Sequence, residues 1–112
     1  MLFRSDDAFR SLREGRLLTN SSPDTIADGL RASLSERTFA IIREHTRGVV
    51  TVSEAQIVSA MRQIWERMKL VVEPSAAVPL AAVLAAPEKF HDKRVGLVLT
   101  GGNVDLDKLP WQ

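Results

Sequence analysis

The strongest constraint on the fold is the apolar run of residues 95–99, which ends at Thr100-Gly101-Gly102-Asn103. A short apolar run that stops at glycine is typical of a β-strand buried on both faces. Two glycines let the backbone turn sharply and come close to another group. Ligands of open α/β sheets bind at the carboxyl ends of the strands, so we expect Thr100 and Asn103 to contact a ligand. An ordinary strand-ending turn explains the same four residues equally well.

Helical and strand-like patterns alternate along the chain, which predicts an α/β fold with parallel strands. Helices are expected at residues 5–14, 34–45, 53–69 and 75–86. Strands are expected at residues 49–52 and 94–99, and residues 25–29 are either a strand end or a structured loop. Two or three strands are few for a sheet, and so small a parallel sheet would expose an apolar edge. We therefore expect the chain to be part of something larger.

Local signals place the ends of these helices. Ser5 is the expected cap of the first helix, which Gly15 ends, and Ser35 is the expected cap of the second. Ser53 begins a capping box that Gln56 completes. Pro79 is expected near the first turn of the last helix, where a missing N–H costs least. Apolar residues at helical spacing predict core-facing stripes, formed by Phe39, Ile41 and Ile42 in the second helix and by Ile57, Ala60, Met61, Ile64, Trp65 and Met68 in the third.

Composition excludes several classes of function. The chain has 112 residues, a formal net charge of +1 and no cysteine. This length suits one domain or a piece of a larger one, and the charge gives no reason to expect a nucleic-acid partner. The lack of cysteine excludes disulfides and thiolate metal ligands and suits a reducing compartment. The apolar run at residues 78–86 is too short to span a bilayer, so we expect a cytoplasmic chain with no membrane partner.

Each polar candidate outside the turn has an ordinary structural explanation beside the functional one. Glu73 precedes a helix, where the helix dipole stabilises a carboxylate. The pair Asp6-Asp7 can offer oxygen ligands to a divalent cation, but the first turn of a helix also favours acidic residues. Asp28-Gly29 is a common turn signal. Arg67 lies near a helix end that favours cations, and a phosphate site there is a weaker interpretation.

Five segments, taken in order, resemble one enzyme family. They are Asp6-Asp7-Ala8, residues 23–30, Val52-Ser53-Glu54, residues 65–75 and residues 100–106. The set is similar to the carboxyl-terminal part of pyridoxal-phosphate-dependent threonine and serine dehydratases, a family that includes serine racemases and threo-3-hydroxyaspartate ammonia-lyases. The resemblance implies an α/β, tryptophan-synthase-like fold (fold type II), in which helices flank a parallel sheet. Residues 1–112 would be the carboxyl-terminal portion of its large cofactor-binding domain.

The resemblance also implies a cofactor site. Thr100 matches the hydroxyl residue that hydrogen-bonds the pyridine nitrogen of pyridoxal phosphate, and a neutral hydroxyl there leaves the ring nitrogen unprotonated. Asn103 belongs to the same turn, and Glu73 matches a glutamate near the ring. Gly29 matches a backbone segment beside the cofactor, and Asp28 lies on its substrate side.

Two further sites follow from the resemblance. Asp7 matches the aspartate of a divalent-cation site for magnesium, calcium or manganese, to which Ser5 would lend its backbone carbonyl. The glutamate of that site would fall at Met1, so we expect weak metal binding. Arg67 matches an arginine near the nucleotide-effector site of serine racemases.

The family's Schiff-base lysine and its phosphate-binding loop lie upstream of the matched region. The four lysines of this chain, Lys69, Lys89, Lys93 and Lys108, all lie outside the lysine motif. We therefore expect the chain alone to be inactive. The full-length enzyme, commonly a homodimer, would dehydrate and deaminate L-threonine, L-serine or a related hydroxyamino acid, with or without racemisation. The alternative is a non-catalytic interaction or complementing fragment.

Overall fold

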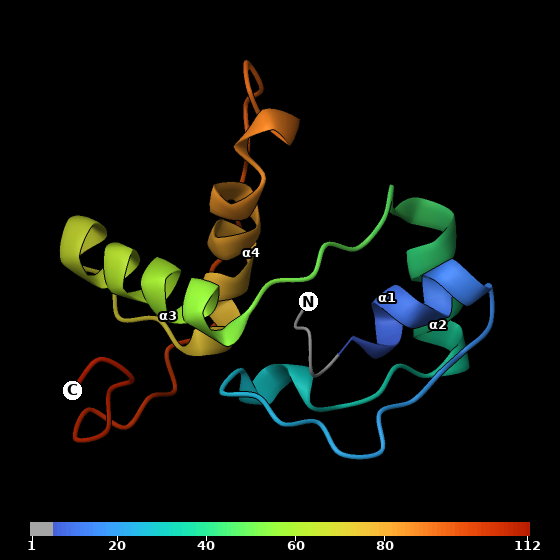
Figure 1. The fold of residues 1–112 in the computed structure, drawn as a ribbon, viewed down its shortest axis with the longest axis horizontal. Coiled ribbons are helices and arrows are strands. Elements are labelled where there is room, and N and C mark those ends of the chain that lie inside the picture. The colour runs from blue at the N-terminus through green and yellow to red at the C-terminus, as the bar shows by residue number, and fades with distance from the viewer. Residues whose placement is uncertain (1–5) are drawn as a thin grey trace. The chain divides into compact units, whose positions relative to one another are not determined.

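A computed structural model describes residues 6–112, which divide into two compact units. The first unit is Met1–Thr51 and the second is Val52–Gln112. Helices joined by loops make up most of each unit (Figure 1). Within the described residues, no helix is both long enough and apolar enough to cross a membrane.

The first unit contains α1 (Asp7–Glu14), a 3₁₀ turn η1 (Asp28–Leu30) and α2 (Glu36–His45). Helix α1 ends as predicted at Gly15, which has a left-handed φ of 71°. The predicted cap of α2 is confirmed, because the Ser35 hydroxyl accepts a hydrogen bond from the Thr38 N–H. Asp6 occupies the N-cap position of α1, whereas Ser5 lies outside the described residues.

Only part of the predicted apolar stripe of α2 is buried. Phe39 is buried, Ile42 is half-buried and Ile41 is half exposed. The inclusion of Ile41 in the stripe is therefore wrong. Adjacent positions on a helix point about 100° apart, so a narrow contact cannot bury both Ile41 and Ile42.

The second unit contains α3 (Glu54–Gln63), a π-helical turn η2 (Ile64–Met68), α4 (Pro74–Ala85) and a 3₁₀ turn η3 (Pro87–Lys89). The capping box at the start of α3 is confirmed, with Ser53 and Gln56 bonding each other's backbone N–H groups. Helices α3 and α4 pack across each other (Figure 1). The core of this unit consists of Val52, Ile57, Ala60, Met61, Ile64, Val72, Ala76, Ala77, Val78 and Ala81.

The π-helical turn explains where the predicted stripe of the third helix fails. Ile57, Ala60, Met61 and Ile64 are buried as expected. Beyond them the helix widens to i→i+5 hydrogen bonding, which changes the angular register of the side chains that follow. Met68, assigned to the core from regular spacing, is 55% exposed.

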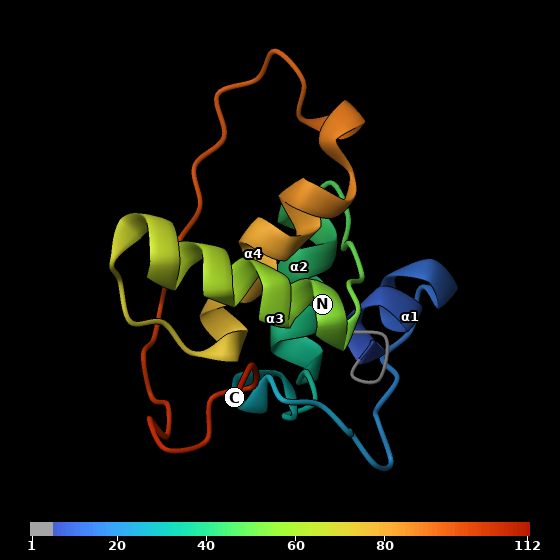
Figure 2. The ribbon, with the colours of Figure 1, turned by 60° about the vertical axis from the view of Figure 1, so that its left-hand side comes forward.

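The predicted strands are not formed. Among residues 6–112, the only strand-type pairing is a single bridge residue, Val52, and residues 94–99 run as an extended, largely exposed segment (Figure 2). The predicted parallel sheet is therefore not present in this part of the chain. A strand needs a neighbouring strand to receive its backbone hydrogen bonds, and the described residues supply none to residues 94–99.

The start of α4 also differs from expectation. Pro74, rather than Pro79, occupies the first helical turn, and Pro79 lies inside the helix. Proline at the first helical position is favourable because its missing N–H would have no helical partner there. The helix thus begins directly after Glu73, which places that carboxylate at the helix entrance.

Candidate functional site

The Thr100–Asn103 turn is fixed against the entrance of α4 by Glu73. The Glu73 backbone N–H donates to the Gly101 carbonyl at 3.0 Å. In the opposite direction, the Asn103 backbone N–H donates to Glu73 Oε2 at 3.2 Å. One residue therefore uses both its main chain and its side chain to hold a turn that lies far from it in sequence.

The two glycines of the turn are required by close approach, not by an unusual φ. A Cβ on Gly101 would lie 2.5 Å from Glu73 Oε1 and 2.8 Å from Glu73 Cδ. A Cβ on Gly102 would lie 2.8 Å from the backbone carbonyl oxygen of Val71. Both positions would bring a Cβ closer than real Cβ contacts, so only glycine fits at either one without a shift of its neighbour.

Glu73 is the N-cap residue of α4, but its side chain makes no capping hydrogen bond. Its extended backbone turns the carboxylate toward the Gly101–Asn103 segment instead. The helix dipole also stabilises a carboxylate beside a helix N-terminus. Glu73 can therefore be stabilised by the dipole and support the turn at the same time. The carboxylate bonds to the backbone of the turn at Asn103 and does not bond to the Thr100 side chain.

Thr100 carries the polar group of the turn that is best suited to a ligand. Its side chain is exposed, and within residues 6–112 its hydroxyl has no hydrogen-bond partner. The side-chain amide of Asn103 is likewise exposed. A hydroxyl can donate one hydrogen bond and can also accept, so Thr100 can bind a ring nitrogen in either role without adding charge.

Trp65 supports the segment that leads into Glu73. Its indole Nε1–H donates to the Val72 carbonyl at 2.9 Å. Its ring meets Trp111 edge to face, with centroids 5.4 Å apart and planes at 78°. From sequence, Trp65 is interpreted simply as core. The requirement of a partly buried indole N–H for an acceptor is the signal that could have predicted this contact.

Asp28 and Gly29 lie in the first unit, on the 3₁₀ turn η1, and both are exposed. Asp28 Oδ1 forms an ion pair with Arg31 Nε at 3.3 Å. Their expected place beside the cofactor or substrate remains a prediction.

Asp7 is a deeply buried acidic side chain of the first unit, with 1% of its surface exposed. Its Oδ1 accepts from Asn20 Nδ2 at 3.1 Å, and its Oδ2 accepts from the Leu34 N–H at 3.3 Å. These bonds join α1 to Asn20, in the loop before η1, and to Leu34, in the segment just before α2. Within residues 6–112, no three His, Cys, Asp or Glu side chains gather as metal ligands. Ser5, the other predicted metal ligand, lies outside the described residues.

Arg67 is exposed on the π-helical turn η2. The hydrogen bond from Arg62 Nε to Glu66, at 2.7 Å, is the main cause that lowers the pKa of Glu66, and the charges of Arg62, Arg67 and Lys69 lower it further. Three basic side chains, those of Arg62, Arg67 and Lys69, therefore act on Glu66. The four lysines of the chain are all exposed, at positions 69, 89, 93 and 108.

Known proteins share much of the sequence and fold of this chain. Residues 4–101 match the family model described as pyridoxal-phosphate dependent enzyme. The chain is 49% identical over 108 residues to the β-hydroxyaspartate dehydratase of Paracoccus denitrificans, a match that covers 96% of this chain and 34% of that protein. It is 45% identical over 111 residues to the serine racemase of Dictyostelium discoideum, covering 94% and 34% of the two chains.

Among solved structures, the T.th. threonine deaminase superposes with a TM-score of 0.89 at 47% identity. That match covers 94% of this chain and 39% of the deaminase chain. The chain therefore spans about a third of the length of the curated relatives it matches. Because most of its residues lie inside the family model, the chain belongs to the pyridoxal-phosphate-dependent enzyme family.

Proposed function

We propose that this chain is the carboxyl-terminal, cofactor-facing portion of a pyridoxal-phosphate-dependent lyase or racemase that acts on a hydroxyamino acid. The observation that carries the proposal is the Glu73-supported turn, which presents the Thr100 hydroxyl without a partner among the described residues. The names of the relatives, a dehydratase, a serine racemase and a threonine deaminase, support the reaction class.

The turn suits the pyridine end of pyridoxal phosphate. Its two glycines leave the backbone open for close approach, and its hydroxyl is neutral. When bound, the cofactor supplies an electron sink for the substrate's α-carbon. The Thr100 hydroxyl would hold the ring nitrogen by a hydrogen bond and, because it is neutral, would leave that nitrogen unprotonated, which would moderate the sink. Glu73 holds the turn in place through its hydrogen bonds to Gly101 and Asn103. Asn103 would line the same side of the cofactor site as Thr100.

The remaining proposed roles rest on the resemblance to the family. Gly29 lines the cofactor and Asp28 the substrate side, while Arg67 belongs to an effector surface. Asp7 and Ser5 belong to a divalent-cation site that is incomplete in this sequence. The complete enzyme converts L-threonine, L-serine or a related hydroxyamino acid to a keto acid and ammonia.

The chain alone is proposed to be inactive, because its lysines lie outside the family's lysine motif and are exposed. The experiment is to co-express it with the two thirds of the Paracoccus dehydratase that it does not match. The complex, loaded with pyridoxal phosphate, should release ammonia from β-hydroxyaspartate or L-threonine, whereas the chain alone should not. Ammonia release by the purified chain alone would refute the proposal that the catalytic lysine is supplied by the other part of the enzyme.

Two matched variants test Thr100 in that complex. Thr100→Ser keeps the hydroxyl and should retain turnover. Thr100→Val keeps the shape but loses the hydroxyl, and turnover should fall roughly tenfold to hundredfold, the effect of one lost hydrogen bond. Equal turnover in both variants would contradict the role of the hydroxyl.

A second candidate function is a non-catalytic interaction fragment, which the exposed apolar residues 95, 97 and 98 favour. In that case the complex forms, and it either releases no ammonia or releases it at the same rate with Thr100→Val as with the parent chain. The same pair of variants therefore separates the two candidates.

A further inference from the structure

A single peptide group joins Trp65 to the Thr100–Asn103 turn. The Val72 carbonyl accepts from the Trp65 indole Nε1–H at 2.9 Å. The Glu73 N–H belongs to the same peptide group and donates to the Gly101 carbonyl at 3.0 Å. A trans peptide is planar, so its C=O and N–H point in opposite directions and rotate together. Trp65 therefore bonds one end of a peptide group whose other end holds the turn.

The segment that contains this peptide group meets the turn at two more points. The Asn103 N–H donates to Glu73 Oε2 at 3.2 Å. The Val71 carbonyl oxygen leaves no room for a Cβ at Gly102. All three contacts come from residues 71–73, so a rotation of the peptide group shifts each of them. Val72 is 4% exposed, and a buried carbonyl that loses its donor costs free energy.

Backbone and packing together fix the Trp65 ring. Trp65 lies in the π-helical turn η2, and such turns change the register of the side chains relative to a regular helix. The Lys69 N–H donates to the Trp65 carbonyl at 3.2 Å, and Lys69 ends the turn with a left-handed φ of 57°. Trp111 packs edge to face against the indole ring. The surrounding fold therefore directs the indole N–H toward the Val72 carbonyl.

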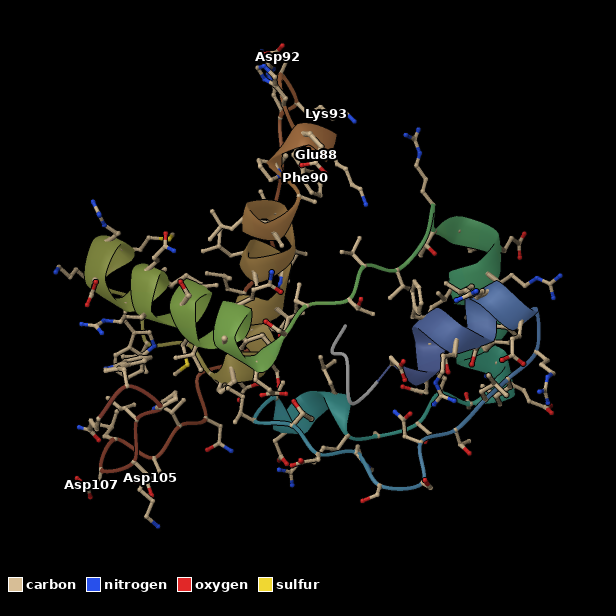
Figure 3. All side chains as sticks on the ribbon, viewed as in Figure 1. Glu88, Phe90, Asp92, Lys93, Asp105 and Asp107 are labelled. Atoms are coloured by element: carbon tan, nitrogen blue, oxygen red, sulfur yellow. The ribbon has the colours of Figure 1, made fainter. Side chains whose placement is uncertain are left out.

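The loop that follows the Thr100–Asn103 turn returns to the same indole ring. Figure 3 shows Asp105 and Asp107 in this loop. The Asp107 N–H donates to Asp105 Oδ1 at 3.1 Å, and a second turn follows at residues 109–112. These turns bend the chain back, and Trp111 reaches the Trp65 ring. One side chain thus contacts both the segment that holds the cofactor turn and the loop that leaves it.

We propose that Trp65 is a positioning residue of the cofactor turn. Its indole N–H fixes the peptide group between Val72 and Glu73, and that peptide group sets where the turn presents the Thr100 hydroxyl. This role rests on the proposed function, because the ligand of Thr100 is the pyridine nitrogen assigned there. Trp65 acts through Glu73 and the backbone of the turn.

Two variants form a matched pair for the test. Trp65→Phe removes the indole N–H and keeps an aromatic ring against Trp111. Trp111→Phe makes the same change in the other ring, whose indole nitrogen has no hydrogen-bond partner among residues 6–112. NMR-detected amide exchange in the full chain then reports on the Glu73 and Asn103 N–H groups, neither of which bonds to Trp65.

Trp65→Phe should speed exchange of these two amides by about twofold to tenfold relative to Ala60 and Met61 of α3, the effect of one net hydrogen bond. Trp111→Phe should leave that ratio within about twofold, as should Leu106→Lys, a change at a side chain that is 60% exposed. A uniform increase across α3 and the turn would mean that Trp65 only stabilises the unit, and would overturn the proposal. Equal ratios in the two tryptophan variants would overturn it as well.

A third variant removes the N–H and keeps the shape of the indole. The chain has two tryptophans, so Trp65 is the single tryptophan of the Trp111→Phe chain. Benzothienylalanine, in which sulfur replaces the indole nitrogen, can therefore be incorporated at this position alone. It should reproduce the faster exchange of Trp65→Phe at Glu73 and Asn103. Exchange as slow as in Trp111→Phe itself would contradict the role of the indole N–H.

The positioning role and the proposed function fail separately. In the co-expressed complex loaded with pyridoxal phosphate, Trp65→Phe should lower kcat by about twofold to tenfold, whereas Leu106→Lys should not. Faster exchange in Trp65→Phe, with turnover unchanged in both Trp65→Phe and Thr100→Val, would refute the proposed function and leave Trp65 as the support of the turn. Reduced turnover in Thr100→Val, with unchanged exchange in Trp65→Phe, would keep the proposed function and overturn the role of Trp65.

Discussion

Replacing Gly101 by alanine tests how Glu73 holds the turn. The new Cβ would lie 2.5 Å from Glu73 Oε1, so the carboxylate must swing away. That movement removes the hydrogen bond from the Asn103 N–H, which stabilises the fold by about 0.5–1.5 kcal/mol. Alanine also restricts the unfolded chain, which restores about 0.4–1 kcal/mol because the φ of Gly101 lies outside the left-handed region. The difference between these two effects lies between a loss of about 1 kcal/mol and a gain of about 0.5 kcal/mol in the free energy of unfolding, so Gly101→Ala alone should have a small effect.

Removing Glu73 as well separates its two effects on the turn. In Glu73→Ala the hydrogen bond is already lost and the obstructing carboxylate is gone. Adding Gly101→Ala should then stabilise the fold by about 0.4–1 kcal/mol. The double-mutant cycle should thus show a coupling of about 1 kcal/mol between the two positions.

Gly102→Ala is the matched control, since its Cβ would meet a backbone atom rather than a side chain. The Val71 carbonyl oxygen lies 2.8 Å away and cannot rotate aside. The expected cost is about 1–2 kcal/mol, the strain of overpacking less the gain in the unfolded chain. Removing Glu73 should not relieve it.

Urea unfolding followed by tryptophan fluorescence provides the assay, because Trp65 and Trp111 are the chain's two tryptophans and both lie in the second unit. A cost of Gly101→Ala that is the same with and without Glu73 would refute the account of the turn. So would a Gly102→Ala variant that is as stable as the parent.

Two predictions concern groups outside the turn. Asp7→Ala removes the acceptor of hydrogen bonds from Asn20 and Leu34 and should cost about 2–4 kcal/mol by urea unfolding followed by circular dichroism; a cost below about 1 kcal/mol would contradict the structural role of this carboxylate. Arg62→Gln should raise the pKa of Glu66 toward its ordinary value in an NMR titration, because the Arg62 hydrogen bond is the main cause of the lowered pKa. Since that pKa is lowered on folding, ionised Glu66 favours the fold above its unfolded pKa, and the contribution is lost as the pH falls through the folded pKa. An unchanged titration of Glu66 in Arg62→Gln would contradict this assignment.

Helix ends were the most predictable part of this fold, because capping is local chemistry. Three of the helix caps lie at the predicted residues: Ser35 and Ser53 cap the N-termini of α2 and α3, and Gly15 ends α1 in a left-handed conformation. Met68 was misassigned because a π-helical turn is not encoded in regular apolar spacing. Pro79 was misplaced because Pro74 is the better first helical residue.

The predicted strands failed for a different reason. The pattern of residues 94–99 describes a strand with neighbours on both edges, and the described residues of this chain contain no such neighbour. Sequence pattern reports the environment for which a segment is suited, whereas structure reports the partners that are present. The Thr100–Asn103 turn was predictable as a close-approach site, but its support by Glu73 was not, because that contact joins positions far apart in the sequence.

The principal role proposed for this chain is to hold the pyridine nitrogen of the cofactor through the Thr100 hydroxyl. The most direct measurement is the NMR resonance of an isotopically labelled ring nitrogen in pyridoxal phosphate bound to the co-expressed complex. We predict an unprotonated, hydrogen-bonded nitrogen whose resonance shifts in Thr100→Val and stays unchanged in Leu106→Lys. A protonated nitrogen, or a resonance that Thr100→Val leaves in place, would contradict the claim.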